Sequence, residues 1–317
     1  MLNNVTHSPP PHPFSFKFEA PSHGSAFYVV ILSTSFIVLI LSPLAVVANG
    51  LILAAIWRKP SLRTPSYVLL AGLALTDLGT GLISQPINVT NWLIYALQPR
   101  MNVADKRRMF VISAMAYGST SFFSSVTIFL MPVISIERWL HMSRRSLINA
   151  RRACFIVVIL FLFLLPITAF RVFQRMKQAA TLGTDVASGL IVPLFLTTTS
   201  IAYFKIFRII RRHQQQIRVI EIPENFAQPA INLTKYKISV SSILCVLVIF
   251  YMGYVPITIS TRISTVLINE LVAVFVNVSF VFMFLSASLN LHLYLWRMKD
   301  IRNEVKLLVK RVFRKEN

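Results

Sequence analysis

Seven long apolar segments dominate the 317-residue sequence and limit the folds open to it. A helix needs about 20 consecutive apolar residues to cross the hydrocarbon layer of a membrane. The segments lie at residues 26–57, 64–97, 109–140, 153–170, 186–204, 238–261 and 271–296. Their charged residues are confined to Asp77 in the second segment and to Glu137 and Arg138 near the end of the third. The pattern predicts an all-α fold, a seven-transmembrane helix bundle.

Composition supports a membrane protein and the charge distribution predicts its orientation. Only 14% of the residues are charged and the mean hydropathy is +0.66, whereas a soluble domain carries about 25% charge. The net charge is +21, but 23 of the 32 lysine and arginine residues flank one end of the segments. Short cytosolic loops are enriched in these residues, and the inner leaflet is anionic. We therefore expect a cytosolic C-terminus, an extracellular N-terminus, contact with membrane lipid and no nucleic-acid partner.

Three regions follow from this topology. Residues 1–25 are rich in proline, histidine and serine and are expected to form a flexible extracellular arm. Asn4 begins a glycosylation sequon there, whereas the sequons at Asn88, Asn232 and Asn277 should be hidden by membrane or cytosol. Residues 26–296 form the transmembrane domain. In residues 297–317, apolar residues recur at helical spacing between basic ones, which predicts a short amphipathic cytosolic helix on the membrane surface. The alternative is an ordinary solvated tail helix.

Polar residues inside the apolar segments are candidates for function, because charge is costly in hydrocarbon. Asp77 needs a partner, a cation or a proton, and Asn49 and Asn290 are placed to reach it. The alternative is a protonated aspartic acid that serves packing alone.

Glu137 and Arg138 could form an ion pair until the arginine is drawn away, or Arg138 could simply extend to the interface. Prolines in six segments, including Pro256, are expected to bend the helices.

Together these residues resemble the rhodopsin-like (class A) G protein-coupled receptors, over nearly the whole chain. Six motifs in the right order carry the resemblance. They are Asn49-Gly50, Leu73-Ala74-Leu75-Thr76-Asp77, Ser135-Ile136-Glu137-Arg138-Trp139, Tyr203-Phe204-Lys205-Ile206, Phe250-Tyr251-Met252-Gly253-Tyr254-Val255-Pro256 and Asn290-Leu291-His292-Leu293-Tyr294. The resemblance implies a receptor, not an enzyme, that binds an extracellular ligand at the plasma membrane and activates a heterotrimeric G protein.

The resemblance also implies three sets of site residues. No cofactor is implied apart from a sodium ion, which would be held by Asp77, Asn49, Thr127, Ser286 and Asn290. Switching and G protein coupling would involve Glu137, Arg138, Tyr203, Phe250, Tyr254, Pro256, Asn290 and Tyr294. The ligand pocket would be lined by Thr120, Ser124, Tyr254, Ile257, Thr261, Phe280 and Phe284, with Tyr254 at its floor.

Several departures from the family pattern bear on function. Trp139 replaces the usual tyrosine, Tyr254 the usual tryptophan and Leu291 the usual proline. Ser113 stands where the family has a bridging cysteine, and the two cysteines, Cys154 and Cys245, lie within apolar segments. Without an acidic partner for Arg138 near residue 236, basal activity is expected to be raised.

The ligand and some competing functions can be constrained further. The outer loops carry a balance of +5, which would attract an anionic ligand, although basic residues also anchor helices at the interface. Thr120 is neutral where amine receptors carry an aspartate. The seventh segment lacks the lysine of a retinal photoreceptor, no metal cluster or nucleophile–base pair indicates a hydrolase, and no repeat indicates a transporter. A non-signalling seven-span pseudoreceptor or scaffold stays open.

Overall fold

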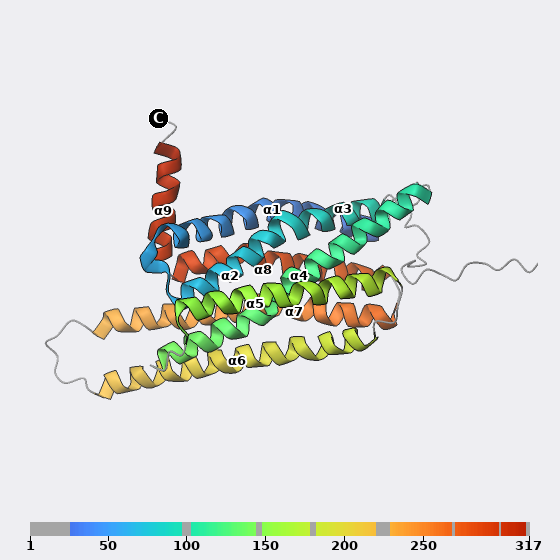
Figure 1. Ribbon diagram of the computed structural model, residues 1–317. Helices are drawn as coiled ribbons and strands as arrows, with labels where there is room; N and C mark the ends of the chain where they lie inside the picture. Colours follow the sequence, from blue (N-terminus) through green and yellow to red (C-terminus); the bar gives the residue numbers. More distant parts are fainter. Residues whose placement is uncertain are drawn as a thin grey trace, which may run out of the picture.

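The computed structural model describes residues 26–96, 103–143, 148–177, 182–219, 229–267, 270–297 and 299–314. Within these ranges all regular structure is helical, and seven helical segments are long and apolar enough to cross a membrane. The long helices lie side by side along one direction, while α9 runs across them at one end of the bundle (Figure 1). The predicted seven-transmembrane all-α bundle with a short C-terminal helix is therefore confirmed.

The helices follow the apolar segments but extend beyond most of them. The elements are α1 (Ala26–Arg58), η1 (Pro60–Leu62), α2 (Pro65–Gly79), η2 (Thr80–Ser84), α3 (Gln85–Ala96), α4 (Val103–Met142), α5 (Ala150–Met176), α6 (Leu182–Val219), α7 (Pro229–Val266), α8 (Glu270–Arg297) and α9 (Lys299–Arg314). The largest difference from the apolar segments is at α6, which continues well past residue 204. Apolar composition marks only the hydrocarbon thickness, and polar flanks can prolong a helix beyond it.

The second span is built from three pieces, because a π-helical turn at Thr80–Ser84 separates α2 from α3. A π turn widens the helix and leaves carbonyl groups without their usual partners. The Ser42 hydroxyl of α1 donates to the Gly81 carbonyl oxygen at 2.8 Å. An added Cβ at Gly81 would stand 3.0 Å from the Ala45 Cβ, so α1 packs directly on the turn. The π turn is therefore a site of close packing between α1 and the second span.

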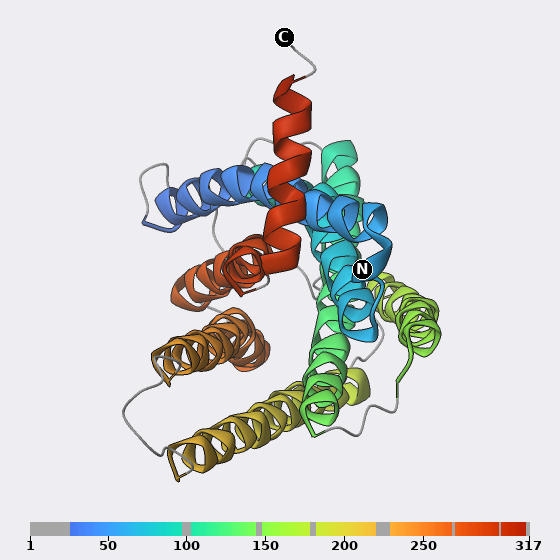
Figure 2. The same cartoon turned by 90° about the vertical axis from the view of Figure 1, so that its left-hand side faces the viewer.

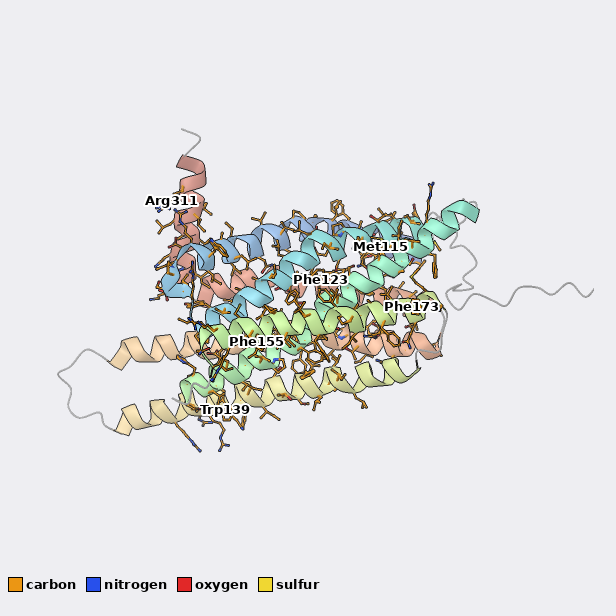
Figure 3. The ribbon with its side chains drawn as sticks, viewed as in Figure 1. Met115, Phe123, Trp139, Phe155, Phe173 and Arg311 are labelled. Carbon is orange, nitrogen blue, oxygen red and sulfur yellow. The ribbon has the colours of Figure 1, made fainter. Side chains whose placement is uncertain are left out.

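Helix α4 occupies the centre and α5 the periphery. Helix α4 packs on α2, α3, α5 and α6, and Figure 2 shows the bundle from the end at which α9 lies. Phe155 and Leu162 of α5 are each 66% exposed, and Figure 3 shows the α5 side chains as sticks. Exposed apolar side chains of this density suit a lipid-facing helix, because lipid tails are as apolar as they are.

The α9 helix has an apolar stripe that docks on the bundle. Ile301 and Val305 are buried, and α9 packs on α1 and α8. The Tyr67 hydroxyl of α2 donates to a carboxylate oxygen of Asp300 at 3.3 Å. Lys306, Lys310 and Arg311 are exposed. The amphipathic pattern expected after the seventh span is thus present in the helix.

Candidate functional site

Polar residues from four spans are buried in the middle of the bundle. Asp77 is 3% exposed and Asn49 is fully buried. The Asn49 side-chain nitrogen donates to the carbonyl oxygens of Ala45, at 2.9 Å, and Ala287, at 3.2 Å. Asn49 therefore joins α1 to α8. Within the described part of the chain its side-chain oxygen is a buried acceptor without a hydrogen-bond donor.

Tyr254 of α7 belongs to the same region through its hydroxyl group. The side chain is buried, its hydroxyl is hydrogen-bonded to Thr127 of α4, and it lies within electrostatic reach of Asp77. Its ring packs on Phe250, with 4.9 Å between the ring centroids. The tyrosine in place of tryptophan thus adds a polar link between α7 and α4. The sequence predicted Tyr254 both among the switch residues and at the floor of the ligand pocket, but it did not predict this link.

The remaining members of the implied sodium site approach through α8. Ser286 donates its hydroxyl to the Met283 carbonyl oxygen at 2.7 Å. An added Cβ at Gly253 would lie 3.1 Å from both the Cβ and the Oγ of Ser286, so α7 and α8 pack closely here. The Asn290 side chain lies outside the described residues.

The donor set can be compared with the needs of a cation. Asp77 is the one carboxylate in the set, and the other described members supply amide or hydroxyl oxygens. In the described residues no group of three His, Cys, Asp or Glu side chains is placed to hold a metal ion. Hard cations prefer oxygen ligands, and one carboxylate balances one positive charge. The set therefore fits a monovalent ion better than a divalent one.

Four of the implied pocket residues face a polar and aromatic cluster between α3, α4 and α8. The Asn88 side-chain nitrogen donates to the Thr120 hydroxyl and to the Ser84 carbonyl oxygen, both at 2.7 Å. The Ser124 hydroxyl lies 3.3 Å from the Met283 sulfur. Trp92 of α3 packs on both Phe280 and Phe284, with ring centroids 6.0 and 6.5 Å apart.

The two α7 residues of the implied pocket are placed differently. Ile257 is 9% exposed. Thr261 is exposed, and its hydroxyl donates to the carbonyl oxygens of its own helix at Ile257 and Thr258. Pro256 lies within α7 as expected. The structure therefore brings Ile257, but not Thr261, into the interior of the bundle.

Three residues of the polar and aromatic cluster were missed in the sequence. They are Gln85, Asn88 and Trp92. Gln85 is fully buried, its amide nitrogen reaches the Phe284 carbonyl oxygen at 3.4 Å, and its amide oxygen has no partner in the described part of the chain. The sequence did contain a signal for Gln85 and Asn88, since both are uncharged amides within an apolar span. Polar groups buried in a membrane need partners within the protein, so both side chains could have been expected to face other helices. Asn88 was considered only as a sequon.

The position of the absent cysteine bridge is held by a hydrogen bond. The Ser113 hydroxyl of α4 donates to the Asn91 side-chain oxygen of α3 at 2.6 Å. Both cysteines are free thiols. Ser113 therefore still joins its helix to a neighbour, but to α3 and by a non-covalent contact.

At the α9 end of the bundle, Glu137 is bound to α2. The Ser66 hydroxyl lies 2.9 and 2.8 Å from the two carboxylate oxygens of Glu137. Ser66 is the second residue of α2, and Thr64 at the start of that helix makes no side-chain cap. A carboxylate at a helix N-terminus is favoured by the exposed N–H groups and the helix dipole. Glu137 thus supplies to α2 the negative charge that a cap residue would provide.

Arg138 and Trp139, which follow Glu137 in the chain, have different surroundings. Arg138 is 9% exposed, and among the described residues no ion pair joins it to Glu137. The Lys205 ammonium of α6 lies 4.2 Å from the centroid of the Trp139 ring, and Figure 3 labels Trp139 at this end of α4. Tyr203 is buried at 2% exposure. The Tyr294 side chain lies outside the described residues, as does Asn4.

Part of the chain matches the model of a known protein family. The model of the 7 transmembrane receptor (rhodopsin family) matches residues 48–184. The chain resembles this family over that part of its length. The match includes Asn49, Asp77 and the Glu137-Arg138-Trp139 triplet, and seven apolar helices agree with it. The motifs of α6, α7 and α8 lie beyond the matched residues. A comparison with curated proteins gives no match.

Proposed function

We propose that this rhodopsin-family receptor transmits the binding of an extracellular ligand to a heterotrimeric G protein in the cytosol. The observation that carries the proposal is the buried contact of Tyr254 with Thr127 beside Asp77. It joins α7, α4 and α2 in the middle of the bundle, between the Thr120 cluster and the Glu137-Arg138 pair. Thr120, Thr127 and Glu137 all lie on α4, so the contact links this helix to α7 at a level between the two clusters.

The orientation follows from the basic residues. The end that carries α9 and Arg138 would face the cytosol, where lysine and arginine are enriched. Exposed basic residues of α9 would meet anionic lipid there. Residues 1–25 would lie outside the cell at the plasma membrane, with Asn4 open to glycosylation. An N-terminal tag that antibodies reach on intact cells, and a faster-migrating band for Asn4→Gln, are the expected results.

The ligand would enter from the opposite end and meet the cluster of Thr120, Asn88 and Gln85. Hydroxyl and amide groups offer hydrogen bonds to a polar ligand, and Trp92 with Phe280 offers an apolar surface. Basic residues near that end, such as the exposed Arg108, would attract an anionic ligand over longer distances. Thr120 is neutral and is hydrogen-bonded to Asn88, so the described residues of this cluster offer a charged amine no carboxylate partner at that position.

A sodium ion would be held by Asp77 with Asn49, Thr127, Ser286 and Asn290. The orphaned Asn49 oxygen supports this proposal, because buried acceptors normally have partners. The ion would add positive charge beside Asp77 and keep α1, α2, α4 and α8 together. Thermal stability of the purified chain should rise when sodium replaces a large organic cation, and Asp77→Asn should remove the rise. Equal stability in the two salts would contradict sodium binding.

The coupling function is tested by basal G protein activation in transfected cells. We expect the natural chain to exceed untransfected cells and Arg138→Ala to lose the excess at equal surface level, because Arg138 would contact the G protein once exposed. Silence of the natural chain at the surface, in every G protein subtype and with a ligand library, would favour a non-signalling scaffold instead.

A further inference from the structure

The Glu137-Arg138-Trp139 triplet is divided between neighbouring helices. Glu137 binds Ser66 of α2, whereas Trp139 lies beneath the ammonium group of Lys205 on α6, 4.2 Å from ring centroid to nitrogen. A cation within about 6 Å of an aromatic face is attracted by the ring, and tryptophan attracts it most strongly. The tryptophan that departs from the family motif is thus the residue that makes this contact.

The contact joins a packed turn of α6 to the end of α4. Tyr203 and Ile206, on either side of Lys205, are 2% and 1% exposed, so this turn of α6 is packed against the bundle. Lys205 itself is exposed and Trp139 is partly buried. The contact therefore closes the packed interface at its solvent edge, one residue away from Arg138.

We propose that Lys205 and Trp139 are positioning residues that hold the cytosolic end of α6 against α4 and so favour the arrangement in which Arg138 is buried. The inference rests on the proposed coupling function, because it assigns a signalling consequence to the contact. A cation–π pair at an exposed edge is weak enough to be exchanged during switching. Its loss should change the equilibrium by about two- to fivefold.

Arg208 provides a matched control. It is also an exposed cation on α6, and its guanidinium lies 5.8 Å from the ring of Phe204. Phe204 belongs to the same helix, so this contact does not bridge α6 to α4. Replacing Arg208 removes the same charge from the same surface without releasing α4.

The signalling test compares Lys205→Gln, Lys205→Arg and Arg208→Gln with the natural chain at equal surface level. We expect Lys205→Gln to raise basal G protein activation about two- to fivefold. Lys205→Arg should stay near the natural level, because arginine keeps the charge and also stacks on aromatic rings. Arg208→Gln should change little. Basal activation by Lys205→Gln that is equal to or below the natural level overturns the proposal, as does an equal rise for Arg208→Gln.

A second test examines the contact without a G protein. Thermal unfolding of the purified full-length chain is measured for Lys205→Gln, Trp139→Leu and the double variant. If the residues interact, the double variant should lose less stability than the two single losses combined. Additive losses overturn the proposal. If the losses are non-additive but every chain is silent in cells, the contact is real and the proposed coupling function is what has failed.

Discussion

The middle of the bundle and its α9 end are held together by different contacts. In the middle, Asn49, Thr127 and Tyr254 form hydrogen bonds between helices while they are shielded from water. At the α9 end, Ser66–Glu137 and Trp139–Lys205 also join helices, but Ser66, Trp139 and Lys205 keep some exposure. A polar group left without a partner in hydrocarbon is costly, whereas one at the surface can turn to water. The middle should therefore determine stability, and the α9 end should adjust the signalling equilibrium at small cost.

The largest effect is expected from Gly72→Ala in α2. An added Cβ would stand 2.7 Å from a methyl group of Val157 in α5 and 3.4 Å from Leu130 in α4. The Val157 side chain or the helices must then shift, which should cost about 1–3 kcal/mol and lower the melting temperature and the surface level. Gly50→Ala is the control, because nothing lies within 4 Å of its added Cβ. Equal losses for both variants would mean that α2 and α5 are not packed this closely.

Tyr254→Phe tests the hydrogen bond in the middle. The ring stays in place against Phe250, and only the contact with Thr127 is lost. A side-chain hydrogen bond within a membrane bundle contributes about 0.6–1.7 kcal/mol, so thermal stability should fall by that amount. Thr127→Val should give a similar loss, and combining the two should add little. A double variant that loses the sum of both effects would show that the two residues do not interact.

Ser66→Ala tests the α9 end. Glu137 would lose its hydroxyl partner at the α2 N-terminus, which should cost about 0.5–1.5 kcal/mol at a partly exposed site. The comparison predicts that this loss appears mainly as raised basal signalling, with a small change in melting temperature. Ser61→Ala is the matched control, since Ser61 is an exposed serine on the preceding short helix. A large fall in stability without a signalling change would reverse the distinction between the two regions.

The smallest effect is expected from Tyr67→Phe. The hydrogen bond to Asp300 is exposed, so its loss should cost less than about 0.5 kcal/mol. Helix α9 should remain docked through the buried Ile301 and Val305. Ile301→Asp should instead release α9, visible as faster amide hydrogen exchange across residues 299–314. Slow exchange in Ile301→Asp would show that the apolar stripe does not hold the helix.

The two regions also differ in how far the sequence revealed them. The seven spans and the amphipathic helix were predictable, because hydrocarbon requires long apolar runs and a surface helix requires helical spacing. Asp77, Asn49 and Arg138 were recognisable as polar residues at unusual depth. The contacts that polar residues make between helices were not recognisable in the sequence. Glu137 and Ser66 are 71 residues apart, and no periodicity in the sequence encodes which helices become neighbours.

The π turn and the role of Tyr254 were hidden for related reasons. A single widened turn at Thr80–Ser84 leaves the apolar pattern of the second span unchanged, and so does the hydrogen bond of Asn88, four residues later, with Thr120. Tyr254 was identified by its position in a motif, which gives its helix but not the direction of its hydroxyl. The link to Thr127 depends on how α7 packs across the bundle.

The most direct test of the account is nucleotide exchange on purified G proteins by the receptor in lipid nanodiscs. Three chains are compared at equal concentration: the natural chain, Arg138→Ala and Glu137→Gln. We expect measurable exchange for the natural chain, none for Arg138→Ala, and faster exchange for Glu137→Gln, whose neutral amide binds the α2 N-terminus less strongly. Equal exchange by all three chains, or none by any across the G protein subtypes, would contradict it.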